Sequence, residues 1–391
     1  MIRPSDSNRM TGTTQGSGGP TVLIVGAGVA GTVCGIRLRQ LGFHVTIAEK
    51  ENFPRNKVCG CCLGGAGLHA FERIALREWL VSQGETTRVW KGSIGHRLIE
   101  LSLPDGIAIS RQTLDSGLLQ QASDAGATVL QPCRVVLEGQ TEEYAEVTLH
   151  TANETRQQRF DLVVMAAGLN AAGLNQALPW RVAPHGPFGA AFHADIDEIE
   201  AGAIYMGCDD DGYVGLVRLE DGRVDVAAAL VSGGGSAGAG TPLHRIEMIL
   251  RRSRFAGLTI RDASPLMTTP PLRRSRPAGM NRLLVIGDAA GYVEPFTGEG
   301  MTWAAQSAIA AADFLASRAG GPSRLGRAST HDWRRVGQDW DQQSRTLLRR
   351  KKQTCRTVTS ALRSSMTRRV AGLLLSHWPG LAKPLIHGLN R

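Results

Sequence analysis

The chain has 391 residues, of which 42% are hydrophobic, and a formal net charge of +9. This length can hold two or three packed units around a sizeable core. No run of 18 apolar residues occurs, so the sequence predicts no transmembrane helix.

Seven cysteines without an export signal favour a reducing cytoplasm. Residues 1–20, rich in Ser, Thr and Gly, are predicted to be a disordered leader rather than a signal peptide.

A glycine-rich turn near the N-terminus lies between a predicted strand, Thr21–Val25, and a predicted helix, Val33–Leu41. Its glycines have the GxGxxG spacing: Gly26, Gly28 and Gly31. In such a turn the first glycine lets the chain leave the strand sharply, and the second lets the backbone approach a pyrophosphate. The third lets the helix pack closely on the sheet. The free N–H groups at the start of the helix are expected to bind phosphates.

An acidic residue follows at the distance expected for a nucleotide-binding fold. The predicted strand Val45–Ala48 ends at Glu49, whose carboxylate is expected to accept hydrogen bonds from both ribose hydroxyls of an adenosine. We include the neighbouring Lys50 in this site. The order of strand, glycine turn, helix and acid predicts a bound dinucleotide. A structural glycine turn beside a solvated glutamate is the alternative.

A second motif, far downstream, distinguishes FAD from NAD. The predicted strand Leu283–Ile286 leads into Asp288, which is expected to hold a ribityl hydroxyl, although an ordinary helix N-cap would also explain it. A helix is predicted over Met301–Ala319, and its N-terminus would stabilise negative charge on the flavin N1–C2=O edge. The residues placed around the flavin are Gly168, Gly287, Asp288, Gly298, Gly300 and Met301.

The order of predicted elements favours an α/β fold with an inserted sheet. Strands also predicted for the nucleotide-binding unit are Thr128–Leu130 and Asp161–Ala166, while Trp90–Ile109 is expected to form short strands around a turn at residues 104–106. Glu220–Arg223 is predicted to join the hairpin strands Tyr213–Leu219 and Val224–Val231. We expect an FAD-binding domain over residues 21–180 and 276–330, a substrate domain over 181–275, and a basic helical region over 331–391.

The positive charge is concentrated in that last region. No acidic residue follows Asp341, and the chain without its eleven later basic residues holds 33 basic and 35 acidic residues. The eleven are Arg345, Arg349, Arg350, Lys351, Lys352, Arg356, Arg363, Arg368, Arg369, Lys383 and Arg391. No nucleic-acid motif occurs, so no nucleic-acid partner is expected. An apolar stripe at helical spacing predicts peripheral contact with an anionic membrane, and a helix packed on the core is the alternative. The stripe consists of Val358, Leu362, Met366, Val370 and Leu373.

Three segments resemble the flavoprotein oxidoreductases of the p-hydroxybenzoate hydroxylase fold, and within them the geranylgeranyl reductase-like branch. They are Phe53–Gly60, Arg111–Leu119 and Gly287–Gly300, and the resemblance covers about residues 21–330. It implies a Rossmann-like FAD-binding domain with an inserted antiparallel sheet. The positions it implies for FAD are Arg55, Lys57 and Arg111, and for the active site Cys59 and Gly60. Solvated loop charges, and a salt bridge between Arg111 and Asp115, are the alternatives.

The cysteines at positions 59, 61 and 62 leave three interpretations open. Cys59 and Cys62 could form a dithiol that exchanges electrons with the flavin, or half of a zinc site. No second CxxC occurs and the other cysteines lack ligand spacing, so we predict no metal site. Packing beside the cofactor is the interpretation we favour. The resemblance to the geranylgeranyl reductase-like branch implies that Cys59 contacts the double bond of a substrate.

Three functions remain open at this point. The first is hydride transfer to a C=C bond of a hydrophobic, lipid-like substrate, and the second is hydroxylation of an aromatic, polyketide or quinone-like compound. The third is a non-enzymatic electron-transfer module. Only one GxGxxG occurs, so NAD(P)H is expected to bind transiently, or a flavodoxin or ferredoxin replaces it. The Trp-x-Trp-x-Ile-Pro segment of flavin-dependent halogenases is missing, so halogenation is not expected.

Overall fold

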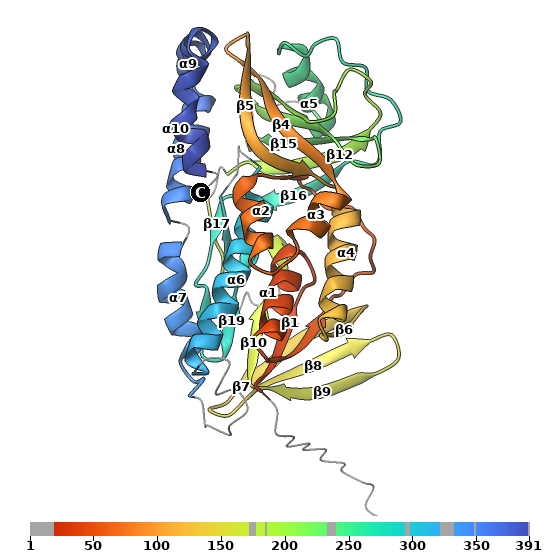
Figure 1. Cartoon of the computed structure of the whole chain (residues 1–391), viewed down its shortest axis with the longest axis vertical. Helices are drawn as coiled ribbons and strands as arrows, with labels where there is room; N and C mark the ends of the chain where they lie inside the picture. The colour runs from red at the N-terminus through yellow and green to blue at the C-terminus, as the bar shows by residue number, and fades with distance from the viewer. Residues whose placement is uncertain are drawn as a thin grey trace, which may run out of the picture.

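The computed structural model describes residues 19–171, 177–183, 186–232, 240–293, 298–320, 332–347 and 349–389. Most of the predicted leader therefore lies outside the described residues. The chain builds a central parallel sheet, a large antiparallel sheet above it and a column of C-terminal helices along one side (Figure 1).

The parallel sheet forms around the predicted N-terminal strand. Its strands, in spatial order, are β18 (Gly279–Met280), β19 (Leu283–Val285), β10 (Leu162–Met165), β1 (Thr21–Val25), β2 (His44–Ala48) and β6 (Thr128–Leu130). β18 pairs antiparallel with β19, and the other neighbours are parallel. Strands buried on both faces are typically continuous apolar runs, as β1 is with Val22, Leu23 and Ile24 fully buried. The predicted strands of this unit are confirmed to within a residue.

Helices cover one face of the parallel sheet and a small antiparallel sheet covers the other. The helices are α1 (Val29–Gln40), α2 (Gly65–Glu72), α3 (Arg77–Gln83), α4 (Arg111–Asp124) and α6 (Gly300–Arg318). The small sheet consists of β7 (Cys133–Gln140), β8 (Ala145–Thr151) and β9 (Thr155–Phe160). Its inward residues Val147, Leu149 and Phe160 pack under β1, β10 and β19. Two layers of apolar side chains therefore hold the carboxyl ends of the parallel strands in place.

The large sheet is mostly antiparallel. In spatial order its strands are β16 (Met267–Pro271), β12 (Phe188–Ala194), β15 (Val224–Leu230), β14 (Gly212–Arg218), β13 (Ala203–Asp209), β4 (Glu85–Ile94), β5 (Arg97–Ala108) and β3 (Cys62–Leu63). The predicted hairpin is confirmed as β14 paired with β15. Helix α5 (Pro242–Arg251), capped by Thr241, packs Ile246, Ile249 and Leu250 on this sheet.

One sequence expectation is wrong in this sheet. Residues 104–106 do not form a hairpin turn, because they belong to β5, which pairs with β4 on both sides of them. The pairing is irregular there, since Thr87 pairs with Gly106 and Val89 with Ser102, so residues 103–105 form a bulge. A Cβ at Gly106 would lie 2.8 Å from both the Leu63 carbonyl oxygen and the Thr87 hydroxyl. A glycine at position 106 therefore allows β5 to lie close to both β3 and β4. β4 and β5 lie within the range expected for the FAD-binding domain, yet they pair in the large sheet.

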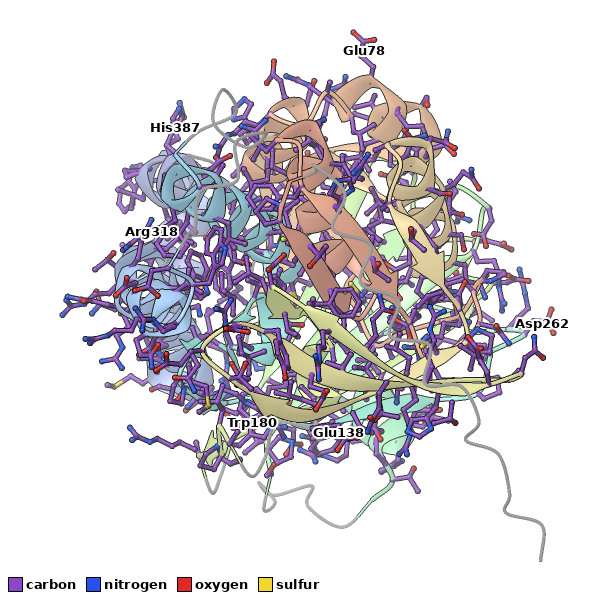
Figure 2. The ribbon with its side chains drawn as sticks, turned by 90° about the horizontal axis from the view of Figure 1, so that it is seen from below. Glu78, Glu138, Trp180, Asp262, Arg318 and His387 are labelled. Atoms are coloured by element: carbon purple, nitrogen blue, oxygen red, sulfur yellow. The ribbon has the colours of Figure 1, made fainter. Side chains whose placement is uncertain are left out.

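The C-terminal region is helical, as expected. Its helices are α7 (Val336–Leu347), α8 (Arg349–Arg363), α9 (Ser365–His377) and α10 (Lys383–Leu389), and a small sheet of β11 (Arg181–Val182), β17 (Arg274–Ser275) and β20 (Gly291–Tyr292) lies beside them. Arg318 and His387 point outward from this side of the molecule (Figure 2). Within the described residues, no helix is long and apolar enough to cross a membrane.

The apolar stripe does not lie on one helix. Ser364 ends α8 and caps α9 by accepting a hydrogen bond from the Thr367 amide. The buried Arg368 side chain donates to the Leu362 carbonyl and pairs with Asp210 of the large sheet. Val358 and Leu362 therefore face a cavity, whereas Met366 and Val370 face outward.

Candidate active site

The glycine turn after β1 brings backbone close to backbone. Gly26 has φ +103°, and a Cβ there would lie 2.7 Å from the Ala166 carbonyl oxygen. A Cβ on Gly31 would lie 1.8 Å from the Gly26 carbonyl oxygen, so only glycine allows α1 to begin here. Gly28 is the N-cap residue of α1, and no side chain caps this helix end. Its N–H groups are therefore available to an anion at the end of the sheet.

Two cations lie over this turn, although they come from separate segments. A Cβ on Gly28 would be 3.7 Å from both Arg111 Nη2 and Lys57 Nζ. Asp115, 1% exposed, accepts hydrogen bonds from Lys57 at 2.6 Å and from Arg111 at 2.8 and 2.9 Å. The predicted Arg111–Asp115 salt bridge therefore exists and holds Arg111 beside the glycine turn. Two cations share one carboxylate, which leaves a net positive charge where a pyrophosphate would lie.

The same arrangement shifts the pKa values of both cations. Burial, together with the positive charges of Arg111 and Arg55, lowers the pKa of Lys57, and Asp115 opposes this effect. Burial also acts against the charge of Arg111, but the neighbouring Asp115 outweighs it and holds the pKa of Arg111 above its ordinary value. Arg111 is thus the permanently charged member of the pair.

Glu49 ends β2 and lines the same cavity. Its carboxylate accepts hydrogen bonds from the backbone N–H of Ala27 at 2.9 Å and of Glu51 at 3.0 Å. These bonds fix the carboxylate between the glycine turn and the next loop, and each oxygen retains a lone pair for a ribose hydroxyl. Lys50 also lines the cavity, but its side chain is largely exposed and lies 3.5 Å from Glu51.

The loop from Phe53 to Cys62 forms one wall of the cavity. Arg55 Nε is buried, with no hydrogen-bond acceptor among the described residues, as is expected of a donor that binds a ligand. Cys59 and Gly60 line the cavity, and a Cβ on Gly60 would meet nothing within 4 Å. The Cys61 thiol donates a hydrogen bond to Cys59 and holds the pKa of Cys59 down to about 7, against the effect of burial. Cys59 therefore carries an exchangeable proton near neutral pH.

The second motif supplies the opposite wall. Gly168, with φ +64°, and Asp288 line the cavity, as do Gly298, Gly300 and Met301 at the start of α6. Burial raises the pKa of Asp288 to about 6, partly opposed by the charges of Arg111 and Lys352. Thr302 also lines the cavity, and its buried hydroxyl has no hydrogen-bond partner within the described ranges. Sequence reasoning missed Thr302, because a threonine inside a helix carries no motif of its own.

Two of the predicted residues do not reach the cavity. Gly31 packs α1 on the glycine turn, and Gly287 packs against Ala30. A Cβ on Gly287 would lie 2.8 Å from the Ala30 Cβ. Both glycines allow the close packing behind the cavity wall, but neither lines the cavity itself. The remaining predicted site residues all lie along it: Gly26, Gly28, Glu49, Lys50, Arg55, Lys57, Cys59, Gly60, Arg111, Gly168, Asp288, Gly298, Gly300 and Met301.

The cavity is about 1120 Å³ and extends well past these residues. Beyond Cys59 it continues between the large sheet and the C-terminal helices. This apolar arm is lined by Trp90, Ile94, Leu101, Leu103, Ile204, Met206, Val358, Leu362, Leu375, Leu385 and Ile386. A polar end with paired cations therefore joins a long apolar end, and the two meet at the Cys59 loop and the start of α6.

Comparisons with known proteins agree with this geometry. Residues 20–342 match the FAD binding domain family, so the chain belongs to this family of flavoproteins, as the resemblance implied. It is an FAD-dependent oxidoreductase with a fold of the p-hydroxybenzoate hydroxylase type. The glycine turn, the cation pair and the unpartnered Arg55 Nε are consistent with such a cofactor.

Relatives with assigned activities are distant. The chain is 27% identical over 327 residues to a menaquinone reductase of Mycobacterium tuberculosis, covering 76% of each protein. It is 26% identical over 311 residues to digeranylgeranylglycerophospholipid reductase 2 of Methanothermobacter thermautotrophicus, covering 75% of this chain and 77% of the relative. Among solved structures, p-nitrophenol 4-monooxygenase from Pseudomonas putida superposes with a TM-score of 0.76 at 14% identity, covering 95% of this chain and 99% of that one.

Proposed function

We propose that the protein is an FAD-dependent reductase that saturates a C=C bond in a long, apolar, isoprenoid-like substrate. The observation that carries this proposal is the apolar arm of the cavity. Its walls from Cys59 to α10 are mostly aliphatic, with Trp90 and Met206 among them, which suits a long hydrocarbon chain better than a compact polar ring. The two distant relatives, named as reductases of menaquinone and of a geranylgeranyl lipid, support the same substrate class.

In this proposal the residues of the polar end hold the cofactor. Lys57 and Arg111, fixed by Asp115, bind the pyrophosphate over the N-terminus of α1, while Glu49 binds the ribose. Asp288 binds the ribityl chain, and the start of α6 lies at the pyrimidine edge of the flavin. When bound and reduced by NAD(P)H, FAD supplies the hydride.

The loop at Cys59 lies where the polar and apolar ends meet. We place the substrate double bond there, so that one carbon receives the hydride and the other receives a proton from the Cys59 thiol. The thiolate is then reprotonated from solvent, and the balance is one NAD(P)H and one proton consumed for each C=C bond reduced. A thiol with a pKa of about 7 is suited to this exchange near neutral pH.

The exposed surface next to the apolar arm suggests how such a substrate enters. The arm ends under α8, α9 and α10, and the outer side of α9, with the short turn that follows it, exposes large apolar side chains near basic residues. The exposed apolar residues are Met366, Val370, Leu373, Leu374, Trp378 and Leu381. We propose that this surface contacts an anionic bilayer, because exposed apolar groups beside positive charge bind such a surface.

Anaerobic turnover tests the proposed reaction. Full-length protein with FAD, NADPH or NADH, and a menaquinone or geranylgeranyl lipid in vesicles should yield product with two added hydrogens under argon. Cys59→Ser should slow this product step while leaving flavin bleaching by NAD(P)H unchanged. Product that forms only with oxygen and gains one oxygen atom would establish the monooxygenase instead. Flavin reduction without any product from these lipids would contradict the substrate class.

A further inference from the structure

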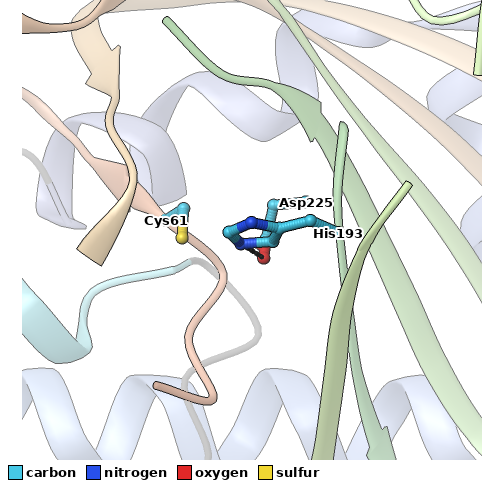
Figure 3. Close-up of side chains that lie close together, drawn as sticks. All are labelled: Cys61, His193 and Asp225. Carbon is cyan, nitrogen blue, oxygen red and sulfur yellow. Dashed lines mark ion pairs between the residues drawn. The ribbon is translucent and has the colours of Figure 1, made fainter. Parts of the chain in front are cut away.

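Behind the wall of the active site, three potential metal ligands meet in a buried cluster. Cys61 belongs to the loop after β2, His193 to β12 and Asp225 to β15. Their side chains point toward one another (Figure 3), and one ligand atom from each lies within 4.8 Å of the others. Cys61 is 0% exposed, His193 6% and Asp225 2%. The cavity-lining residues do not include any of the three.

The fold places each member with little freedom. His193 and Asp225 are directly opposite each other in the antiparallel pairing of β12 with β15. Cys61 has φ +50°, a left-handed conformation that is unfavourable for a residue with a side chain. Its neighbours Cys59 and Cys62 line the cavity, whereas the Cys61 thiol reaches the two strands behind it. Backbone strain at a buried cysteine is a reason to look for a bound group there.

The side chains of His193 and Asp225 do not form an ordinary hydrogen bond with each other. The His193 Nε2 to Asp225 Oδ1 distance is 3.4 Å, longer than a normal N–H···O bond. In the described part of the chain, Asp225 Oδ1 has no hydrogen-bond partner although it is buried. His193 and Cys61 are the neighbours that oppose the effect of burial on the Asp225 carboxylate, but neither gives Oδ1 a hydrogen bond of good geometry. A cation between the three side chains would satisfy this oxygen.

Tetrahedral zinc would supply what is missing. Zinc bonds to nitrogen and oxygen of about 2.0–2.1 Å, and to sulfur of about 2.3 Å, put neighbouring ligand atoms roughly 3.3–3.6 Å apart. The His193–Asp225 separation of 3.4 Å already matches such an edge. Since the ligand atoms lie within 4.8 Å of one another, the sulfur needs to move by at most about 1.5 Å to reach such an edge. Thiolate, carboxylate and neutral imidazole around Zn²⁺ give a site without net charge, as burial requires.

We propose that Cys61, His193 and Asp225 bind one Zn²⁺ ion, with an enclosed water molecule as the fourth ligand. Binding removes the Cys61 proton and takes His193 as neutral imidazole, so protons are released to solvent. Zinc-bound Cys61 has no proton to donate to Cys59, so the lowered pKa of Cys59 described above applies to the metal-free loop. The ion would join the Cys59 loop to two strands of the large sheet and so fix the loop between the FAD end and the apolar arm of the cavity.

Metal binding to the full-length flavoprotein tests this proposal without an activity assay. Protein treated with a chelator, dialysed, and then incubated with zinc should retain one zinc per chain and melt at a higher temperature. With Co²⁺ in place of zinc, a tetrahedral thiolate site should absorb at wavelengths longer than the flavin bands. Cys61→Ser and His193→Gln should each weaken the metal affinity by more than about tenfold.

Cys62→Ser is the matched control, because this buried cysteine of the same loop is outside the cluster. It should retain zinc like the original chain, and flavin content shows that each variant is folded. Failure of the original chain to bind zinc would show that the cluster is a buried ion pair only and overturn the proposal. Equal zinc binding by Cys61→Ser and the original chain, or equal loss in Cys61→Ser and Cys62→Ser, would overturn it as well.

Discussion

At the scale of single residues, the three glycines of the first turn differ in the reason why a side chain would not fit there. Gly26 and Gly31 are required by backbone contacts inside the protein, because a Cβ at either would overlap a carbonyl group. Gly28 is different, since a Cβ there would still be 3.7 Å from the nearest atoms, which are those of Lys57 and Arg111. A glycine is therefore needed at position 28 because of the cofactor that we place between the turn and the two cations, and not because of a contact within the protein.

We expect Gly28→Val to lose FAD while the protein remains folded. The branched side chain would occupy the space between the turn and the cations, at a cost above 1.4 kcal/mol, or more than about tenfold in FAD affinity. Flavin absorbance per chain after gel filtration measures this. Gly257→Ala is the control, because its Cβ would meet nothing within 4 Å and the residue does not line the cavity. Stoichiometric FAD in purified Gly28→Val would refute the assignment of the turn.

Asp288 makes the stability of the FAD-free protein depend on pH. Its pKa is about 6 when folded and near 3.8 when unfolded, so between these values the folded state holds more protons. Stability therefore falls as pH rises through this window, by about 1–3 kcal/mol. Asp288→Asn should remove this loss, stabilising the FAD-free protein at pH 8 but not at pH 3.5. Urea denaturation at the two pH values is the measurement, and an equal effect at both would contradict the prediction.

At the scale of elements, the active-site loop is held by strands of the large sheet. β3 begins at Cys62, directly after the loop, and pairs with the end of β5. Gly106 lies where β3, β4 and β5 come closest. The geometry of the loop thus depends on a strand that the sequence interpretation had divided by a turn.

Gly106→Ala should destabilise the fold and disturb the loop. The new methyl group would lie 2.8 Å from the Leu63 carbonyl and the Thr87 hydroxyl, an overlap expected to cost about 1–3 kcal/mol. Gly139→Ala in β7 is the matched control, since its Cβ would meet nothing within 4 Å. Denaturant midpoints compare the two variants. If both variants have the denaturant midpoint of the original chain, the contacts of Gly106 with β3 and β4 leave room for a methyl group and the prediction is wrong.

At the scale of the whole molecule, the C-terminal helices have two apolar sides. One side closes the arm of the cavity, and the other exposes Trp378, 61% accessible, and Leu381, 58% accessible. No acidic residue lies in α8, α9 or α10 to oppose their positive charge. The enclosed hydrocarbon space and the proposed membrane surface are thus two faces of the same elements.

The double variant Trp378→Ser with Leu381→Ser should weaken binding to anionic vesicles by more than about tenfold, because each large apolar side chain contributes roughly 1.5–3 kcal/mol when buried. Co-sedimentation with phosphatidylglycerol vesicles, at low and high salt, measures this. Val81→Ser is the control, since Val81 is exposed on α3. Equal sedimentation of double variant and original chain, or none by either, would exclude this surface as the membrane contact.

Several features of this protein could be predicted from local pattern alone. The glycine turn, its flanking strand and helix, and Glu49 are contiguous in sequence and obey rules that act over a few residues, so they were placed to within a few positions. The second motif was equally recognisable, because Asp288 and the start of α6 are again a local strand-to-helix connection. These two blocks are sufficient to define an FAD-binding protein.

Other features were decided only by the tertiary structure. Asp115 holds Lys57 and Arg111 together across more than fifty residues, and Gly106 is part of a strand because neighbouring strands require a residue without a side chain. The stripe over Val358–Leu373 divides at Ser364, where α8 ends and α9 begins, and Arg368 of α9 pairs with Asp210 in the turn between β13 and β14. Cys61 meets His193 and Asp225 through strand pairing that no spacing in the chain reveals. In each case the cause is a contact between distant segments, and a local pattern contains no information about which segments will meet.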